Sequence, residues 1–388
     1  MLPATKRLYL SADAFLKPLE QPFVYDRRTD ELYELNPEAF AFLDGCRTGR
    51  GQSEAEGDFD FTRFCLDEGL LVETGPPPRC PLPARAPSPS LRYLEVHLTA
   101  RCNLSCRHCY LGEAQKKDLP CPVLRTLLED FEEFGGRRLL LSGGEPLLYP
   151  DFWELNELLA DRAYRTVLLS NGSLLNRETV PRLLVQEVQL SLDGLAGGHD
   201  RLRGAGSFRQ ALKALDLLQE DGFDVAVATM VHSGNLEEID ELRRFLVDRG
   251  VKEWSVDLPS PAGRLTELDV PPHLAAPYLD LAFGGGTHGA YGELACGSHL
   301  AAVSVKGHLV KCGFYASSPG SSLAGGLRRA WEELPKVILA DLACHPSCPS
   351  LDSCRGGCRY RAEVLDGPGA ADPVGCARYG QDGPNNEV

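Results

Sequence analysis

The 388-residue sequence is poor in three features that mark particular classes of protein. No apolar run approaches the roughly 18 residues that cross a bilayer. The first six residues, MLPATK, carry no hydrophobic segment of a secretion signal. Basic residues are scarce, since 40 Lys and Arg stand against 55 Asp and Glu, a net charge of −15. Nucleic acids and anionic membranes attract basic surfaces, so we expect neither as a partner and expect a cytoplasmic location.

The chain is nevertheless apolar enough to fold and unusually rich in cysteine. Its 43% hydrophobic content and its length predict two or three globular domains. In a large protein of the reducing cytosol, cysteines more often ligate metals or lie buried as thiols than form disulfides. Ten of the fourteen cysteines fall into two clusters, which predicts metal centres in both places.

The first cluster has the spacing C-x3-C-x2-C, with cysteines at Cys102, Cys106 and Cys109. It follows an alternating apolar run, residues 94–98, that predicts a strand entering a loop. Thiolates favour zinc or iron–sulfur clusters, and a cubane cluster held by three of them leaves one iron free for another ligand. A structural zinc site is the alternative, but it would need a further pair of ligands nearby, and no such pair follows.

Strands and helices alternate between residues 92 and 265. The predicted strands are 93–98, 138–141, 166–169, 188–192, 225–231 and 254–258, with helices that include 123–134, 208–220 and 236–247. Hydrophobic strands separated by helices predict a parallel sheet, which we interpret as a partial barrel. Three strands run into short polar or glycine-containing loops, SGGEP at 142–146, SNG at 170–172 and SLDG at 191–194. Functional groups of such folds gather at these strand ends.

The cysteine loop and the three strand-end loops together resemble the radical S-adenosylmethionine (SAM) superfamily, whose fold is a partial (β/α)6 barrel. The resemblance implies that Cys102, Cys106 and Cys109 are catalytic and hold a 4Fe-4S cluster, whose open iron is chelated by SAM. Glycines would let the backbone approach SAM, and Glu145 would pair with its ammonium group. The complete set of SAM-binding residues implied is His108, Gly143, Gly144, Glu145, Ser170, Asn171, Ser191 and Arg203.

Residues 1–73 predict a hairpin, 23–26 with 31–35, followed by helices that begin at Asn36-Pro37 and at Phe59. This pattern resembles the winged-helix module of the pyrroloquinoline quinone peptide chaperone, which recognises precursor peptides. The resemblance implies that a leader peptide adds as a strand at the open sheet edge, around residues 23–42. The alternative is a packing domain without a ligand. The linker 74–91 has seven prolines and could hold the module beside the barrel mouth, so that removing residues 1–80 would spare the SAM site.

The second cluster lies in residues 266–388 and contains Cys296, Cys312, Cys344, Cys348, Cys354, Cys358 and Cys376. Its spacing resembles the SPASM extension of peptide-modifying radical SAM enzymes, which carries two auxiliary 4Fe-4S clusters. The resemblance implies a distal cluster on Cys344, Cys348, Cys354 and Cys376, and a proximal cluster on Cys296, Cys312 and Cys358. One iron of the proximal cluster would be open or held by another group. Three residues separate Cys344 from Cys348 where two are usual, and two zinc sites are the structural alternative.

These resemblances imply an α/β enzyme that uses SAM and three clusters to make a thioether or carbon–carbon crosslink in a ribosomally made precursor peptide. A flavodoxin or ferredoxin would supply the electrons. Three alternatives stay open: a decarboxylase of a haem precursor, suggested by the Pro-x-Gly-Arg sequence at 261–264, an activator of another protein such as a sulfatase, and a non-enzymatic electron carrier.

Overall fold

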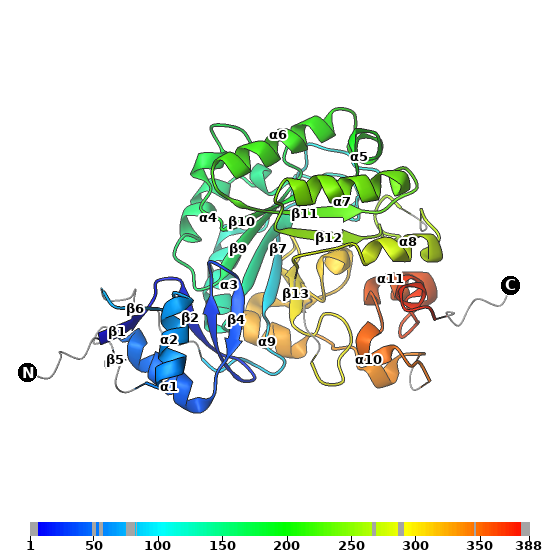
Figure 1. The fold of residues 1–388 in the computed structure, drawn as a ribbon. Coiled ribbons are helices and arrows are strands. Elements are labelled where there is room, and N and C mark those ends of the chain that lie inside the picture. The colour runs from blue at the N-terminus through cyan, green and yellow to red at the C-terminus, as the bar shows by residue number, and fades with distance from the viewer. Residues whose placement is uncertain are drawn as a thin grey trace, which may run out of the picture.

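The computed structural model describes residues 7–48, 52–53, 57–74, 82, 84–265, 269–285, 291–344 and 347–381. Within these residues the strands form three sheets, two small ones near the N-terminus and one of nine strands. In Figure 1 the N-terminal module (blue) lies on one side of the large sheet and the C-terminal segment (orange to red) on the other. None of the described helices is both long and apolar enough to cross a membrane.

The N-terminal module contains the predicted hairpin and both predicted helices. Its first sheet has the order β2-β3-β4 and its second the order β5-β1-β6. Asn36 caps the first helix by accepting a hydrogen bond from Ala39 N at 2.8 Å, as its place before Pro37 predicts. The elements are β1 (Arg7–Leu10), β2 (Ala14–Pro18), β3 (Pro22–Asp26), β4 (Glu31–Glu34), α1 (Pro37–Arg47), β5 (Gln52–Ser53), α2 (Phe59–Asp67) and β6 (Leu71–Val72).

The nine-stranded sheet has the order β12-β11-β10-β9-β8-β7-β13-β14-β15. The six predicted strands are present and parallel, so the expected α/β class with a parallel sheet is confirmed. They are β7 (Tyr93–Thr99), β8 (Arg138–Gly143), β9 (Arg165–Ser170), β10 (Glu187–Ser191), β11 (Asp224–Met230) and β12 (Glu253–Asp257). The helices of this part are α3 (Cys121–Glu133), α4 (Phe152–Leu158), α5 (Ala196–Arg203), α6 (Ser207–Glu220) and α7 (Ile239–Asp248).

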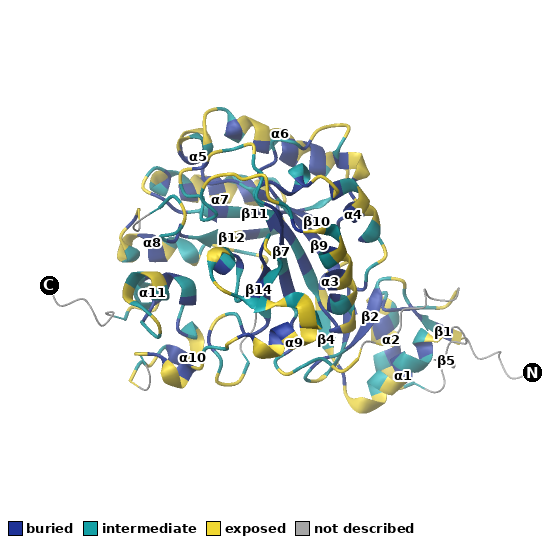
Figure 2. Cartoon of the chain, turned by 180° about the vertical axis from the view of Figure 1, so that it is seen from behind, coloured by how far each residue is buried: buried dark blue, intermediate teal, exposed yellow. Residues whose placement is uncertain are grey.

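Burial follows this layering. The residues of β7 to β11 are buried or half-buried, and the helices present exposed outer faces to solvent (Figure 2). On α3, for example, Leu124, Leu127, Leu128 and Phe131 are at most 2% exposed and face the sheet. Their spacing of three and four residues places them on one face of the helix.

The C-terminal segment contributes to the barrel sheet itself. Strand β13 (Leu300–Val303) pairs in parallel with β7, and antiparallel pairing continues the sheet into β14 (His308–Val310) and β15 (Ser321–Ser322). The barrel sheet therefore extends beyond the six strands predicted for residues 92–265. The remaining helices are α8 (Pro272–Leu279), α9 (Gly326–Glu333), α10 (Leu351–Cys354), α11 (Arg359–Asp366) and α12 (Pro373–Arg378).

The N-terminal module is attached to the amino ends of the barrel strands. Lys17 is 1% exposed, and its ammonium group donates to Gly136 O at 2.6 Å and to Ala163 O at 2.5 Å. These carbonyls belong to the segments that precede β8 and β9. A buried ammonium group needs such acceptors, so module and barrel satisfy each other's polar groups.

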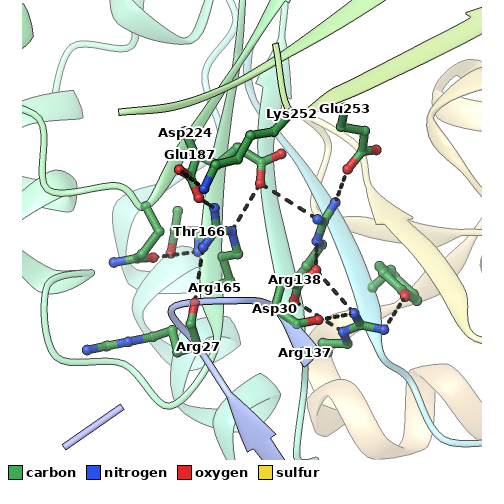
Figure 3. A network of polar contacts seen from close by, with 12 residues as sticks. Arg27, Asp30, Arg137, Arg138, Arg165, Thr166, Glu187, Asp224, Lys252 and Glu253 are labelled. Carbon is green, nitrogen blue, oxygen red and sulfur yellow. Dashed lines mark hydrogen bonds and ion pairs between the residues drawn. The ribbon is translucent and has the colours of Figure 1, made fainter. Parts of the chain in front are cut away.

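The turn between β3 and β4 inserts into the same end of the barrel (Figure 3). Asp30, at its tip, adopts a φ of +61° and is 8% exposed. Its carboxylate accepts from Tyr25 at 2.7 Å, from Arg137 at 3.2 Å and from Arg138 at 2.5 Å. The turn expected to be free for a leader peptide is therefore occupied by the barrel.

The polar contacts continue across the base of the sheet (Figure 3). Arg138 also donates to Glu253 at 3.1 Å, at the start of β12. Arg165 donates to Glu187 at 3.0 Å and to Asp224 at 2.5 Å, at the starts of β10 and β11. Because this network lies at the amino ends of parallel strands, the module is docked at the end of the barrel opposite the strand-end loops. The structure thus contradicts the expectation that the module lies beside the barrel mouth, because its hairpin turn lies at the opposite end of the barrel. Most of linker residues 75–83 lie outside the described residues.

Candidate functional site

Four cavities contain the predicted cysteines, and two of the four share Cys102, Cys106 and Cys109. One of these two, here called the barrel cavity, measures about 1060 Å³ with its open mouth included. Its lining contains nearly all of the residues predicted to hold the first cluster and SAM: Cys102, Cys106, Cys109, His108, Gly143, Gly144, Ser170, Asn171, Ser191 and Arg203. These residues come from four different strand ends, which the parallel sheet brings to one edge.

The cysteine loop is held against the glycine loop that follows β8. Gly144 N donates to Thr99 O at 2.8 Å, and Glu145 N donates to Arg101 O at 2.8 Å. A Cβ atom at Gly143 or Gly144 would overlap the carbonyl oxygens of Thr99 and Arg101. The two glycines are therefore required for the close approach of the two loops, in addition to any role toward a ligand.

A second turn holds the cysteine loop from its other side. In the Pro-x-Gly-Arg sequence, Arg264 N donates to Cys109 O at 3.1 Å and Arg264 Nε donates to Gly112 O at 3.2 Å. Gly263 has a φ of +58°, and a Cβ there would overlap Cys109 O. The turn thus packs directly on the loop that carries the three cysteines.

Glu145 is the predicted SAM-binding residue that does not line the barrel cavity. Its carboxylate is fully buried and accepts from Ser170 Oγ at 2.9 Å and from Asn171 N at 3.0 Å. Burial raises the pKa of Glu145 to about 7, although these hydrogen bonds oppose the shift. In this structure Glu145 joins the loops after β8 and β9 from behind the cavity wall.

Burial also keeps two histidines beside the cysteine loop neutral near pH 7. It lowers the pKa of His108 and His199 to about 4, and the Arg203 guanidinium adds to the effect at both. His108 Nδ1 is buried and has no hydrogen-bond partner among the described residues. A neutral imidazole at this position can accept or donate toward a bound ligand.

Sequence reasoning missed a group of side chains between the barrel cavity and the C-terminal segment. Glu95 of β7 lines the cavity and accepts from His97 Nε2 at 2.9 Å. Burial opposes its ionisation, but His97 and hydrogen bonds from Ser142 and from Gly313 N hold the pKa of Glu95 below its usual value. The i, i+2 spacing of Glu95 and His97 on one strand face was the available signal.

Aromatic rings connect the first cysteine loop to the second cysteine cluster. Tyr110 directly follows Cys109, and its ring centroid lies 5.0 Å from that of Phe314. Phe314 stacks on Tyr360 at 5.4 Å. Phe314 and Tyr360 each lie two residues after a cysteine, Cys312 and Cys358 respectively. The two cysteine clusters are therefore joined by a continuous series of packed rings.

The seven C-terminal cysteines separate into two further cavities. The proximal cysteine cavity contains Cys296, Cys312 and Cys358, and the distal cysteine cavity contains Cys344, Cys348, Cys354 and Cys376. This is the grouping that the SPASM resemblance implied. Among the described residues, no three His, Cys, Asp or Glu side chains could hold one metal ion between them. The groups are defined here by the cavities that they share.

The donor set of these cavities is chemically suited to iron–sulfur clusters. Burial and neighbouring thiols raise the pKa of Cys376 to about 11, and burial raises that of Cys358 to about 12. Thiols in such surroundings ionise when a cationic centre compensates the charge, which the irons of a cluster would do. Among the described residues, the lining of the proximal cavity contains no fourth cysteine, histidine or carboxylate.

Comparisons with known proteins show similarity in sequence and in fold. Residues 96–246 match the Radical SAM superfamily. An AdoMet-dependent heme synthase of Methanosarcina barkeri is 35% identical over 188 residues, 46% of this chain and 53% of that protein. The chain thus spans about half the length of the heme synthases that it matches. The mycofactocin maturase MftC of Mycobacterium ulcerans is 29% identical over 331 residues, 74% of this chain and 88% of MftC.

The fold is also similar to that of solved structures. Streptococcus suis SuiB, in a crystal structure with its precursor peptide SuiA, superimposes with a TM-score of 0.72 at 16% sequence identity. The superposition covers 95% of this chain and 99% of SuiB. The mixed α/β fold with its parallel sheet is therefore shared with SuiB along nearly the whole chain.

Proposed function

We propose that this protein is a radical SAM enzyme that makes an oxidative crosslink, a thioether or a carbon–carbon bond, in a ribosomally made precursor peptide. The observation that carries the proposal is the grouping of ten cysteines into sets of three, three and four, with no cavity shared between two sets. The match to a maturase over 74% of the chain, against 46% for a heme synthase, favours a peptide over a haem precursor.

In the barrel cavity, Cys102, Cys106 and Cys109 would hold the first 4Fe-4S cluster. When bound, SAM and this cluster supply a 5′-deoxyadenosyl radical that abstracts a hydrogen atom from the substrate. Gly143 and Gly144 bring the backbone to the cavity edge, and Arg203 offers a cation to a carboxylate. The remaining predicted SAM contacts are His108, Ser170, Asn171 and Ser191, with Glu145 acting behind them. The walls of the cavity would shield the reacting groups from water once substrate covers the mouth.

The proximal and distal cysteine cavities would hold the two auxiliary clusters. Three cysteines at the proximal site leave one iron for a substrate thiolate or another group. The stacked rings of Tyr110, Phe314 and Tyr360 lie between this site and the barrel cavity. Electrons for the first cluster would come from a flavodoxin or ferredoxin in the cytoplasm.

The N-terminal module would bind the leader of the precursor along β4. This strand is an edge of its sheet, and edge strands accept a further strand by backbone hydrogen bonds. Phe64 of α2 packs edge-on against Tyr33 of β4 at 5.5 Å, and Phe59 is 70% exposed. The exposed ring of Phe64 beside this edge strand is suited to apolar side chains of an extended peptide.

The test is to produce the protein together with a short peptide encoded next to its gene and to analyse that peptide by mass spectrometry. Loss of two hydrogen atoms per crosslink, dependent on Cys106, is the expected result. The anaerobically reconstituted protein should contain about twelve irons, four for each cluster. An iron content near four with bound zinc would contradict the auxiliary clusters, and conversion of a haem precursor instead of the peptide would favour the alternative enzyme.

A further inference from the structure

Arg203 lines the barrel cavity, and its side chain forms an ion pair with a buried residue to which the sequence motifs gave no role. Its side chain is 12% exposed, and its Nε donates to the carboxylate of Asp193. Asp193 is fully buried and belongs to the SLDG loop after β10, whereas Arg203 ends α5. Asp193 does not line the cavity, so it can act on a ligand only through Arg203.

Asp193 is itself fixed from three directions. Its second carboxylate oxygen accepts from Met230 N at 2.8 Å, at the end of β11. Its backbone N donates to His199 Nδ1 at 3.0 Å, and its backbone O accepts from Asn235 Nδ2 at 2.7 Å. The backbone of Asp193 is thus held by His199 and Asn235 and its carboxylate by Met230 N, so the side chain has little freedom and can define the direction of the guanidinium that it binds.

The charge of this pair is also well defined. Burial alone would raise the pKa of Asp193, but the Arg203 guanidinium and nearby histidines outweigh it and lower the pKa to about 2. The carboxylate is therefore ionised at neutral pH. Among the described residues, no hydrogen bond engages the two terminal guanidinium nitrogens of Arg203, which carry four N–H groups, and Arg203 lines the barrel cavity.

A second acid fixes the start of the helix that carries Arg203. The carboxylate of Glu238 accepts from Leu195 N at 2.7 Å and from Gly198 N at 3.0 Å, at the first turn of α5. A Cβ at Gly194 or Gly198 would overlap this carboxylate. Helix α5 is thus held at its start by Glu238 and at its end, through Arg203, by Asp193.

We propose that Asp193 is the positioning residue that aims the Arg203 guanidinium into the barrel cavity, where it binds the carboxylate of the amino-acid part of SAM. The proposal rests on the proposed function, because it takes SAM as the ligand of this cavity. An arginine held through Nε keeps its two terminal nitrogens parallel, and these match the two oxygens of a carboxylate.

The experiment measures SAM binding to the anaerobically reconstituted full-length protein by equilibrium dialysis, for Asp193→Asn, Arg203→Lys and the double variant. Each single variant should raise the Kd for SAM roughly tenfold or more, because a charge-assisted hydrogen bond is lost or misdirected. The double variant should bind no more weakly than Arg203→Lys, since the two residues act as one unit. Asp216→Asn, which breaks an exposed ion pair with Arg249 on the same barrel, is the matched control and should bind SAM normally.

The split between binding and turnover identifies a positioning role. Asp193→Asn should raise the KM for SAM in 5′-deoxyadenosine formation while kcat changes less. If Asp193→Asn loses iron or does not fold, the variant carrying both Asp193→Asn and Arg203→Met removes both charges of the buried pair and replaces it. Its Kd should equal that of Arg203→Met alone.

Three results would overturn the proposal in distinguishable ways. Normal SAM affinity of a correctly loaded Asp193→Asn, with a weakened Arg203→Lys, would show that Arg203 needs no positioning by Asp193. Normal affinity of both would remove Arg203 from the SAM site and would count against the proposed function of this cavity as well. Additive losses in the double variant would likewise refute a common unit.

Discussion

Asp30→Asn should loosen the N-terminal module from the base of the barrel. Asparagine has the shape of aspartate and tolerates the φ of +61° at this position, so the change removes the charge and replaces one acceptor oxygen by an NH2 group that cannot accept from the arginines. Removing one partner of a buried ion pair costs about 3–5 kcal/mol. In the variant, Arg138 still has its ion pair with Glu253 at 3.1 Å, and its side chain is 16% exposed, so its charge is not left wholly uncompensated. We therefore expect a loss of about 2 kcal/mol, a decrease in Tm of roughly 4 °C.

Thermal unfolding of the reconstituted protein, followed by circular dichroism, measures this loss. Hydrogen exchange should show where it arises, with faster exchange at the starts of β8 and β9 and in the β3–β4 turn. The control is Asp67→Asn on the same module, because Asp67 is 71% exposed and lies 3.8 Å from Arg63. Exposed pairs of this kind contribute at most about 1 kcal/mol. The control should therefore unfold like the wild type.

The outcome that refutes this reasoning is an Asp30→Asn protein whose Tm and exchange at β8 equal those of the wild type. The module would then be bound to the barrel by its apolar contacts alone, or not rigidly. A truncated protein lacking residues 1–80 sharpens the test. Because it removes Asp30 from Arg137 and Lys17 from two carbonyl oxygens of the barrel, we expect it to be less stable and to cleave less SAM, contrary to the expectation from the sequence.

Three further predictions concern the barrel itself. Cys106→Ala should abolish 5′-deoxyadenosine formation under dithionite while about eight irons remain, and measurable SAM cleavage by this variant would disprove its place in the first cluster. Gly144→Ala should reduce iron loading of the first cluster, because its Cβ would overlap Arg101 O, and an unchanged iron content would contradict that steric reasoning. Stability toward urea should decrease as the pH falls from about 6.5 toward 4. The fold keeps His108 and His199 neutral in this range, whereas the unfolded chain binds protons at both. Replacement of His199 by Gln should flatten this dependence, and an unchanged slope would exclude His199 as its source.

The local sequence pattern was sufficient to predict structure where the residues that contact one another are also close in the chain. The six parallel strands were predicted because each buried strand is a continuous apolar run with a glycine or polar loop at its end. The cysteines of the barrel cavity could be grouped from their spacing, because a short loop brings nearby thiols together. Glu145 was recognised from its motif, but its burial behind Ser170 and Asn171 was not, since the direction of a side chain depends on the neighbouring strand.

Contacts between distant segments left no comparable signal. The sequence around Lys17 is that expected for a surface lysine, and the sequence around Asp30 is that expected for an exposed turn. Both residues are nevertheless buried against the barrel. Glu95 and Asp193 are acids within apolar strands or loops, and only their partners, His97 and Arg203, explain their burial.

The sequence by itself determined the fold class, the succession of strands along the chain and the loops at their ends, because these depend on periodicity and on local turn chemistry. The cysteine spacing is a property of the sequence itself. Only the tertiary structure decided that β13 completes the sheet beside β7 and that the N-terminal module closes the base of the barrel. It also decided that Asp193 holds Arg203. The physical reason is that a buried charge is stable only with a partner, and the partner is chosen by packing in three dimensions rather than by position in the chain.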